Sequence, residues 1–558
     1  MRDILKKIGK VINPSLFLCA IINIYYLFFT ILPEMARFEG LFTKTSAFIL
    51  ALSLVQRLLE QKKKIKLRFI IPDLAFIIIL FSISGSNRVF QIYLLGRQTY
   101  YIVNFLIAHF NRGELKEKLS NNPPVIVLIS FLLAIFIGSL LLMLPNATVD
   151  GQRTSFMGAV FTSTSATCVT GLIVYDTATH FTMLGQTIIL FLIQIGGLGI
   201  MTISSAFAIM LGQRMTIKHE SMMLNVVGGS NKIDMRNLIR SIILATVIIE
   251  LIGAAILYFT FHNEFNTINE ATYYSVFHSI SAFCNAGFSL YSDNFMDFKF
   301  NFNINFVITS LIILGGIGFP VISDVKKQLF KKPGLIRLSL HSKIVITTTS
   351  ILILIGMIGF FIAEYNQQMA GFNIAERLYT SYFQSVTTRT AGFNTLDNGT
   401  LSYSSIMLTI ILMFIGASPG STGGGVKTTT LAVIFVSVSA LFRGNRDVNI
   451  FRRRVADDII KKVMALIAIS ILIIFFMIFL LFMTESLSFE KILFEAISAF
   501  GTVGLSMGIT SQLTAAGKGI IIFLMYFGRV GPLTLIFAIS GAQAKSHFTF
   551  AEEKFSIG

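Results

Sequence analysis

The chain has 558 residues, of which 54% are hydrophobic and only 13% are charged, and its mean hydropathy is +0.75. Many apolar runs approach the roughly 20 residues that cross a bilayer as a helix. These values exclude a soluble globular protein and predict an all-α polytopic membrane protein. The formal net charge is +17. Because the basic residues lie in short segments between apolar runs, this charge indicates topology and no nucleic-acid partner.

The first 123 residues are predicted to form an N-terminal membrane extension of about four helices. Their apolar runs lie at 15–33, 42–59, 69–83 and 89–110. Four crossings would keep the basic N-terminus in the cytoplasm. Arg88 and Arg97 are nine residues apart in the last run and fall near one helical face. Two interpretations stay open for them: contact with lipid headgroups at the interface, or a degenerate voltage-sensor-like bundle.

Beyond this extension, a glycine-ended phrase occurs four times. The copies are FTSTSATCVTGL, FHSISAFCNAGF, FQSVTTRTAGF and FEAISAFGTVGL, and their glycines are Gly171, Gly287, Gly392 and Gly504. A second phrase also occurs four times, as IGGLG, LGGIGFP, IGASPG and FGRVGP. Its first glycine lies 24 to 28 residues after the glycine that ends the first phrase. Two phrases that stay in register through four copies indicate an internal repeat of about 110 residues.

Each repeat is predicted to contain an apolar helix, a short segment with the glycine phrase, and a second apolar helix. The short segment has about 15 residues, too few to span the membrane, so we expect it to enter and return. Non-helical backbone at that depth is tolerated only beside protein or water, which predicts four re-entrant pore loops around a pseudo-fourfold pore. The predicted repeats are 124–236, 237–341, 342–455 and 456–545, followed by a cytoplasmic tail at 546–558.

Charge in the connections predicts the orientation. The segments 212–240, 326–343 and 443–462 together hold 18 Lys and Arg against 5 Asp and Glu, so they are expected in the cytoplasm. The loops would then enter from outside. A permeant cation exchanges its hydration shell for carbonyl oxygens, and glycine permits the unusual dihedrals that point carbonyls into a pore. The predicted ion selectivity filter is Val169, Thr170, Gly171, Asn285, Ala286, Gly287, Thr390, Ala391, Gly392, Thr502, Val503 and Gly504.

The stretches TSATCVTGL, NAGF, TTRTAGFNT and GTVGLS, with their second glycine phrases, resemble the Ktr/Trk/HKT superfamily of potassium transporters over about 124–545. The bacterial Ktr-type membrane subunit is the most similar. The resemblance implies potassium as the transported ion, because Gly171 stands where sodium-preferring relatives have serine. It also implies a homodimer in the bacterial cytoplasmic (inner) membrane, a cytoplasmic nucleotide-binding regulatory ring docked on the basic loops and the C-terminal tail, and sodium as a candidate activator.

The second helix of repeat three is interrupted by GASPGSTGGGVKTTT, in which Pro419 and five glycines cannot continue a regular helix. A flexible loop is therefore expected, with a purely structural kink as the alternative. In the family the corresponding loop is an intramembrane gate. The resemblance thus makes gate candidates of Gly420, Ser421, Thr422, Gly423, Gly424, Gly425, Val426 and Lys427.

Arg529 lies in FGRVGP within the last helix, where an ionisable group should face water or a partner. In the family an arginine at this place lies just below the filter, where its charge would compete with a bound cation. The gate prediction therefore includes Arg529. A salt bridge to an acidic residue is the alternative.

The sequence has no nucleotide-binding motif between a strand and a helix, and no set of catalytic residues at catalytic spacing. GSTGGGVKT interrupts an apolar helix and lacks the strand that precedes a phosphate loop, so nucleotides are expected to act only through a partner subunit. The chain is predicted not to be an enzyme.

The preferred function is channel-like potassium uptake. The alternative is a sodium-coupled secondary transporter of a small solute, but such transporters typically use inverted repeats and a midplane site. A membrane scaffold would not need four polar glycine loops.

Overall fold

The computed structural model describes residues 123–198, 235–329, 338–445, 447–532 and 534. The chain divides into two compact units. One comprises Asn121–Met143, Thr154–Ala208 and Arg214–Gly558, and the other comprises Met1–Ser120, Leu144–Arg153 and Ile209–Gln213. Of the latter, the described segment contains the one-turn 3₁₀ helix η2 (Pro145–Ala147). The predicted N-terminal extension with Arg88 and Arg97, most of the connection 212–240, part of the connection 326–343 and the tail 546–558 lie outside the described residues.

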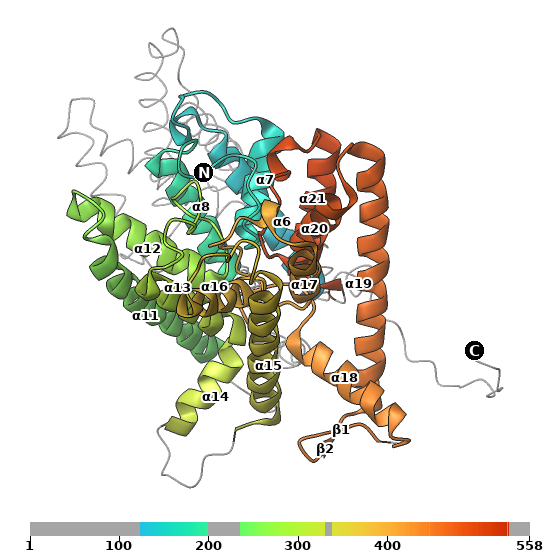
Figure 1. The fold of residues 1–558 in the computed structure, drawn as a ribbon. Coiled ribbons are helices and arrows are strands. Elements are labelled where there is room, and N and C mark those ends of the chain that lie inside the picture. The colour runs from blue at the N-terminus through green and yellow to red at the C-terminus, as the bar shows by residue number, and fades with distance from the viewer. Residues whose placement is uncertain (1–122, 199–234, 330–337, 446, 533, 535–558) are drawn as a thin grey trace, which may run out of the picture. The chain divides into compact units, whose positions relative to one another are not determined.

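Four long apolar helices open the four predicted repeats. They are α6 (Pro123–Leu142), α11 (Met235–Phe261), α15 (Leu340–Ala363) and α19 (Asp457–Thr484). Each is long and apolar enough to cross a membrane. On α19 (Figure 1), Leu472 and Phe475 are 68% and 67% exposed. Such open apolar faces suit lipid and not water, so the chain is a membrane protein.

A short helix and a further helix follow each long one. The short helices are α7 (Phe156–Thr167), α12 (Ile268–Cys284), α16 (Ile374–Thr387) and α20 (Phe489–Gly501). The further helices are α8 (Met183–Gly197), α13 (Phe302–Ile317), α17 (Tyr403–Phe414) and α21 (Ala515–Val530). Side chains of Ser155, Thr267 and Asn373 accept hydrogen bonds from backbone amides in the first turns of α7, α12 and α16, which explains where these short helices begin. The 3₁₀ turns η3 (Asn398–Thr400) and η4 (Thr510–Gln512) precede α17 and α21.

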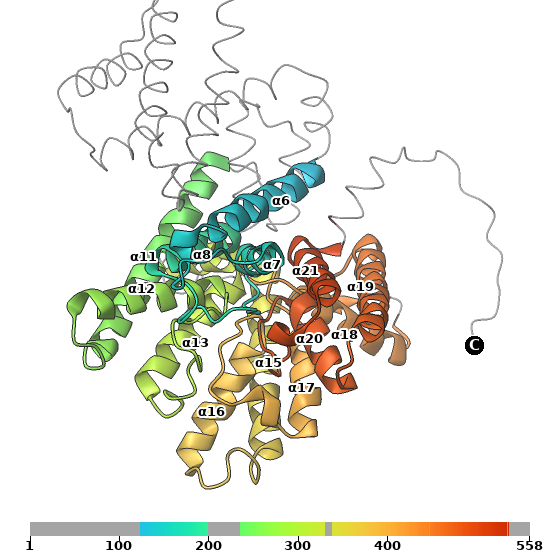
Figure 2. The same cartoon turned by 90° about the horizontal axis from the view of Figure 1, so that it is seen from above.

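The helices of this unit pack in a closed cycle. Each short helix packs on the long helix before it. In addition, α8 packs on α12, α13 on α16, α17 on α20, and α21 on α7. Figure 2 shows the resulting four sets of helices around a common centre. Every short helix is thereby held between its own repeat and the preceding one, which places the ends of all four near one another.

Two of the further helices are broken in different ways. In repeat two, α13 bends by 97° into α14 (Phe319–Leu329). Gly318 allows the bend because its φ of +98° is one that other residues rarely adopt, and Pro320 suits the first turn of the new helix. This bend was not expected from the sequence. In repeat three, α17 ends at Phe414 and α18 (Thr428–Phe442) begins after a non-helical segment, residues 415–427.

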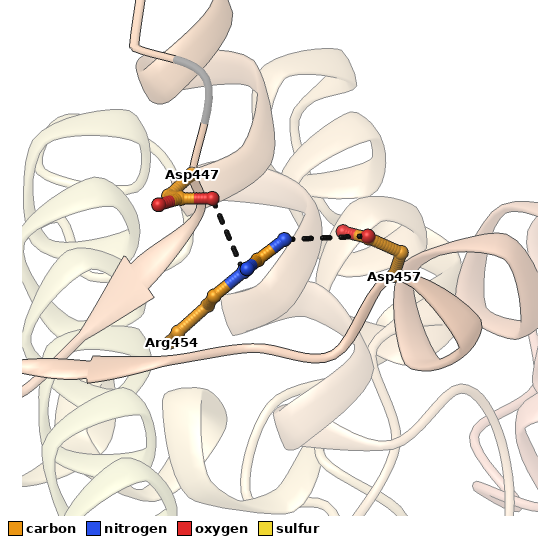
Figure 3. Close-up of polar contacts among 3 residues, drawn as sticks. All are labelled: Asp447, Arg454 and Asp457. Carbon is orange, nitrogen blue, oxygen red and sulfur yellow. Dashed lines mark hydrogen bonds and ion pairs between the residues drawn. The ribbon is translucent and has the colours of Figure 1, made fainter.

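A small hairpin connects α18 to α19. Strands β1 (Asn449–Ile450) and β2 (Arg453–Arg454) pair antiparallel, and their two-residue turn has positive φ at Phe451 and Arg452. Figure 3 shows Arg454 between Asp447 and Asp457, with Arg454 Nε 3.1 Å from the first carboxylate and its terminal nitrogen 3.4 Å from the second. All three side chains are more than half exposed, so these ion pairs contribute little stability.

The glycines of the second phrase lie directly against the ends of the short helices. A Cβ added at Gly196, Gly315 or Gly528 would collide with the backbone carbonyl oxygen of Thr167, Phe283 or Phe500, respectively. Each of these carbonyls belongs to the residue four positions before a glycine of the first phrase: Gly171, Gly287 or Gly504. The glycine of the second phrase lets its helix approach the end of the short helix, and the glycine of the first phrase lies just beyond that end. This contact explains why the two phrases keep the same spacing.

Gly528→Ala should therefore destabilise the protein, by about 1–3 kcal/mol for an overpacked site. The matched control is Gly519→Ala in the same helix α21, because nothing lies within 4 Å of an added Cβ there. Alanine improves helix propensity, so Gly519→Ala should leave the melting temperature unchanged or raise it. Thermal unfolding of the purified protein in detergent would compare them. Equal melting temperatures for the two variants would contradict the close approach.

Candidate ion-binding site

The four glycine phrases end in loops of the same backbone conformation. In each loop, two residues separated by one have positive φ, a combination that is uncommon outside glycine. These pairs are Val169 and Gly171 (56° and 94°), Asn285 and Gly287 (60° and 70°), Thr390 and Gly392 (73° and 78°), and Thr502 and Gly504 (50° and 92°). The structure thus gives all twelve predicted filter residues one repeated shape.

The four loops meet in a closed ring. A Cβ added at Gly171 would lie 2.5 Å from the carbonyl oxygen of Ala286, and one added at Gly287 would lie 2.8 Å from that of Ala391. Likewise, a Cβ at Gly392 would collide with the carbonyl of Val503, and one at Gly504 with the carbonyl of Thr170. The middle residue of every predicted filter triplet therefore presents its carbonyl to the glycine of the neighbouring loop. A side chain at any of these four positions would force the neighbouring carbonyl to move.

Hydroxyl groups on the short helices hold the loops in place. Ser165 Oγ accepts a hydrogen bond from Gly171 N (3.1 Å), and Ser498 Oγ accepts one from Gly504 N (3.2 Å). In the other two repeats, Ser281 Oγ donates to Phe288 O (2.7 Å) and Thr387 Oγ1 donates to Phe393 O (2.5 Å). Sequence reasoning had missed these four hydroxyls. Their signal was present, since each stands four residues after the phenylalanine that opens its phrase.

A second set of polar side chains, directly after those phenylalanines, reaches the chain beyond the glycine in three repeats. His278 Nε2 accepts from Leu290 N at 3.2 Å. Gln384 Nε2 donates to Asn398 Oδ1 at 3.3 Å. The Glu495 carboxylate accepts from Ser506 Oγ (2.7 Å) and from the Thr510 hydroxyl. The short helices of these three repeats therefore use one apolar and two polar side chains to shape their loops, and that of repeat one uses one of each. The phenylalanines of all four repeats are buried: Phe161, Phe277, Phe383 and Phe494.

Ser498→Ala should lower stability by about 1–3 kcal/mol, because it leaves the half-buried Gly504 amide without its hydroxyl partner. Ser470→Ala is the matched control. Ser470 is equally buried, but its hydroxyl donates only to Leu466 O of its own helix, where the loss strands no amide. Melting temperatures of the purified variants would test this. A loss at Ser470 as large as that at Ser498 would refute the proposed anchoring.

The non-helical segment 415–427 is tied to repeat two by backbone hydrogen bonds. Ser418 N donates to Gly316 O (3.0 Å) and Thr422 N donates to Gly315 O (3.2 Å). In return, Phe319 N donates to Gly420 O (3.0 Å). These bonds use the carbonyls and amides that the bend between α13 and α14 leaves free of helical pairing. The bend at Gly318 and the break in repeat three therefore form one interface.

The same segment lies against the ring. Gly424 N donates to Thr502 Oγ1 (3.0 Å), and a Cβ added at Gly423 would collide with Thr390 Oγ1. Lys427 Nζ donates to the carbonyls of Gly423 (2.8 Å) and Gly424 (3.3 Å), so its ammonium group satisfies two carbonyls that have no helix to pair with. The predicted gate residues thus directly contact two of the predicted filter residues.

Arg529 connects this segment to repeat one. Its guanidinium is buried and donates to the carbonyls of Thr422 and Gly196. No acidic side chain of the described residues forms an ion pair with Arg529. The salt bridge that the sequence left open as an alternative is therefore replaced by hydrogen bonds to carbonyls. A guanidinium offers five donors in a rigid fork and can bridge two carbonyls in this way.

The fold and this ring define a polytopic membrane protein whose glycine loops converge on one centre. The TrkH family, described as cation transport protein, matches residues 98–547, and the chain belongs to this family. It is 45% identical to Ktr system potassium uptake protein B of Bacillus subtilis over 75% of this chain and 94% of that protein. The protein of the same name from Vibrio alginolyticus is 38% identical, over 76% and 93%. The family predicted from the loop phrases is confirmed.

A solved structure shares the fold. The crystal structure of the potassium transporter TrkH from Vibrio parahaemolyticus matches with a TM-score of 0.62 at 18% identity, covering 89% of this chain and 97% of that one. At this identity the likeness concerns the fold alone. It supports the arrangement of helices described above independently of the loop phrases.

Proposed function

We propose that this chain takes up potassium through the ring of four glycine loops. The observation that carries the proposal is the ring itself, in which the carbonyls of Thr170, Ala286, Ala391 and Val503 meet the neighbouring glycines. A ring of backbone carbonyls can replace the hydration shell of a potassium ion. The names of the two relatives, which are potassium uptake proteins, support potassium as the ion. The membrane is proposed to be the bacterial cytoplasmic membrane.

Gly171→Ser should reduce the preference for potassium over sodium, because it displaces one oxygen ligand of the ring; we expect roughly a tenfold change, which corresponds to about 1.4 kcal/mol. The serine Cβ would lie 2.5 Å from Ala286 O and move that carbonyl. Rubidium and sodium uptake would be measured in cells that lack their own potassium importers. Gly508→Ser is the matched control, since Gly508 also has positive φ (81°) but nothing within 4 Å of an added Cβ. Uptake by the wild type with unchanged preference in Gly171→Ser would exclude Gly171 from the filter.

We further propose that residues 420–427 within segment 415–427 are the gate and that Arg529 holds it closed. The support is positional: the segment contacts Thr390 and Thr502 of the ring, and Arg529 donates to Thr422 O within it. A non-helical segment rich in glycine can change its backbone conformation at low cost. The arginine charge would also oppose a cation beside it.

Arg529→Ala should therefore raise the maximal uptake rate several-fold, since hydrogen bonds to charged groups contribute about 1.5–3 kcal/mol each. Arg529→Lys keeps the charge but loses the fork that reaches both Thr422 and Gly196. Initial rates of rubidium uptake at saturating concentration, measured for both variants, would separate the contribution of the hydrogen bonds from that of the charge. An Arg529→Ala variant that is present in the membrane and no faster than wild type would contradict a closing role.

The proposed assembly is a homodimer bound to a cytoplasmic nucleotide-binding ring, with sodium as activator. The word "system" in the names of both relatives supports more than one component. In the described residues, the hairpin between α18 and α19 offers a docking surface, because Phe451, Arg452 and Arg453 are exposed at and beside its turn. Nucleotides would act on this chain only through that partner.

A further inference from the structure

A buried carboxylate lies behind the second loop and has no role in the function proposed above. Glu250 is in the middle of α11, within the apolar span Arg240–Phe261, and is only 7% exposed. Its partners are neutral: Gln194 Nε2 donates to it at 3.3 Å, and the Cys284 thiol at 3.8 Å. No basic side chain of the described residues forms an ion pair with it. A buried carboxylate with only long, neutral contacts is costly, so a reason for it is required.

Packing does not require an acid at this position. Ser163, Ser279 and Ser385 of the short helices each donate to one carbonyl of the preceding long helix, at 2.7 Å in every case. The acceptors are the carbonyls of Ile135, Glu250 and Ile353, which therefore occupy equivalent places in repeats one, two and three. Two of the three repeats fill this place with isoleucine. The carboxylate of repeat two must serve something other than helix packing.

The carboxylate lies close to the ring. Cys284, which contacts it, immediately precedes the predicted filter triplet Asn285–Gly287. Because Cys284 is two residues before Ala286 and successive Cα atoms are about 3.8 Å apart, the carboxylate is within roughly 15 Å of the Ala286 carbonyl. The C-terminal end of α12, which carries the negative end of the helix dipole, lies at the same place.

We propose that Glu250 is the counter-charge for the transported cation and sets the affinity of the ring for it. This inference rests on the proposed uptake function. The isoleucines of repeats one and three supply no such charge at the equivalent places. Attraction between unit charges across roughly 15 Å, at the dielectric response of a partly buried site, corresponds to a several-fold change in affinity.

The test is rubidium uptake as a function of rubidium concentration in cells that lack their own potassium importers, at one sodium concentration. Glu250→Gln keeps the shape of the side chain, and Glu250→Ile restores the residue found in repeats one and three. Both should raise the half-saturating concentration several-fold and leave the maximal rate per membrane-inserted protein nearly unchanged. Glu250→Asp, which keeps the charge, should stay close to wild type.

Glu364→Gln is the matched control. Glu364 is fully buried, but its carboxylate accepts from Ser402 N (2.9 Å), Ser402 Oγ (2.7 Å) and Gln368 N (3.2 Å) at the start of α17. Its loss should lower the melting temperature without changing the half-saturating concentration. Wild type without uptake would reject the proposed function itself. Wild-type uptake with an unchanged half-saturating concentration in Glu250→Gln or Glu250→Ile would overturn this inference alone, as would absence of both variants from the membrane, which would assign Glu250 a structural role.

Discussion

The close approach of four backbone segments is the constraint on which the described structure depends. Each loop carbonyl lies close to where the neighbouring residue would have its Cβ, so a side chain at Gly171, Gly287, Gly392 or Gly504 would displace a carbonyl of the ring. The strained dihedrals of the residues two positions earlier are tolerated because hydroxyls and carbonyls of the short helices over-determine each loop. The helices around the ring serve to keep these four segments at contact distance.

The support for this contact is also built from close approach. Gly196, Gly315 and Gly528 let a helix touch the carbonyl at the end of a short helix. In repeat three the corresponding helix ends early, and residues 415–427 take its place against the ring. The absence of regular helix there leaves carbonyls and amides that repeat two, Lys427 and Arg529 must satisfy. The break in the helix of repeat three therefore explains the hydrogen bonds that this segment makes with repeat two, with Lys427 and with Arg529.

The sequence was sufficient to predict what repetition and length determine. The membrane class and the family were predicted from apolar runs and four glycine phrases, and the comparisons confirm the family. The phrases also indicated which residues come together, although their role as a filter stays a prediction. The bend at Gly318 was missed, because a glycine two residues before a proline resembles an ordinary helix end until its partner in segment 415–427 is known. Glu250 was missed as well, because its importance appears only beside Ile135 and Ile353.

The closed cycle of helices within a single polypeptide has a consequence for how such a protein can evolve. In an assembly of four identical subunits, every mutation in a loop appears four times and changes all walls together. Here each wall is encoded separately, so a mutation alters one quarter of the ring and leaves the other three to maintain the contact. The broken helix of repeat three, the acid of repeat two and the arginine of repeat four are differences that only such an arrangement allows to accumulate independently.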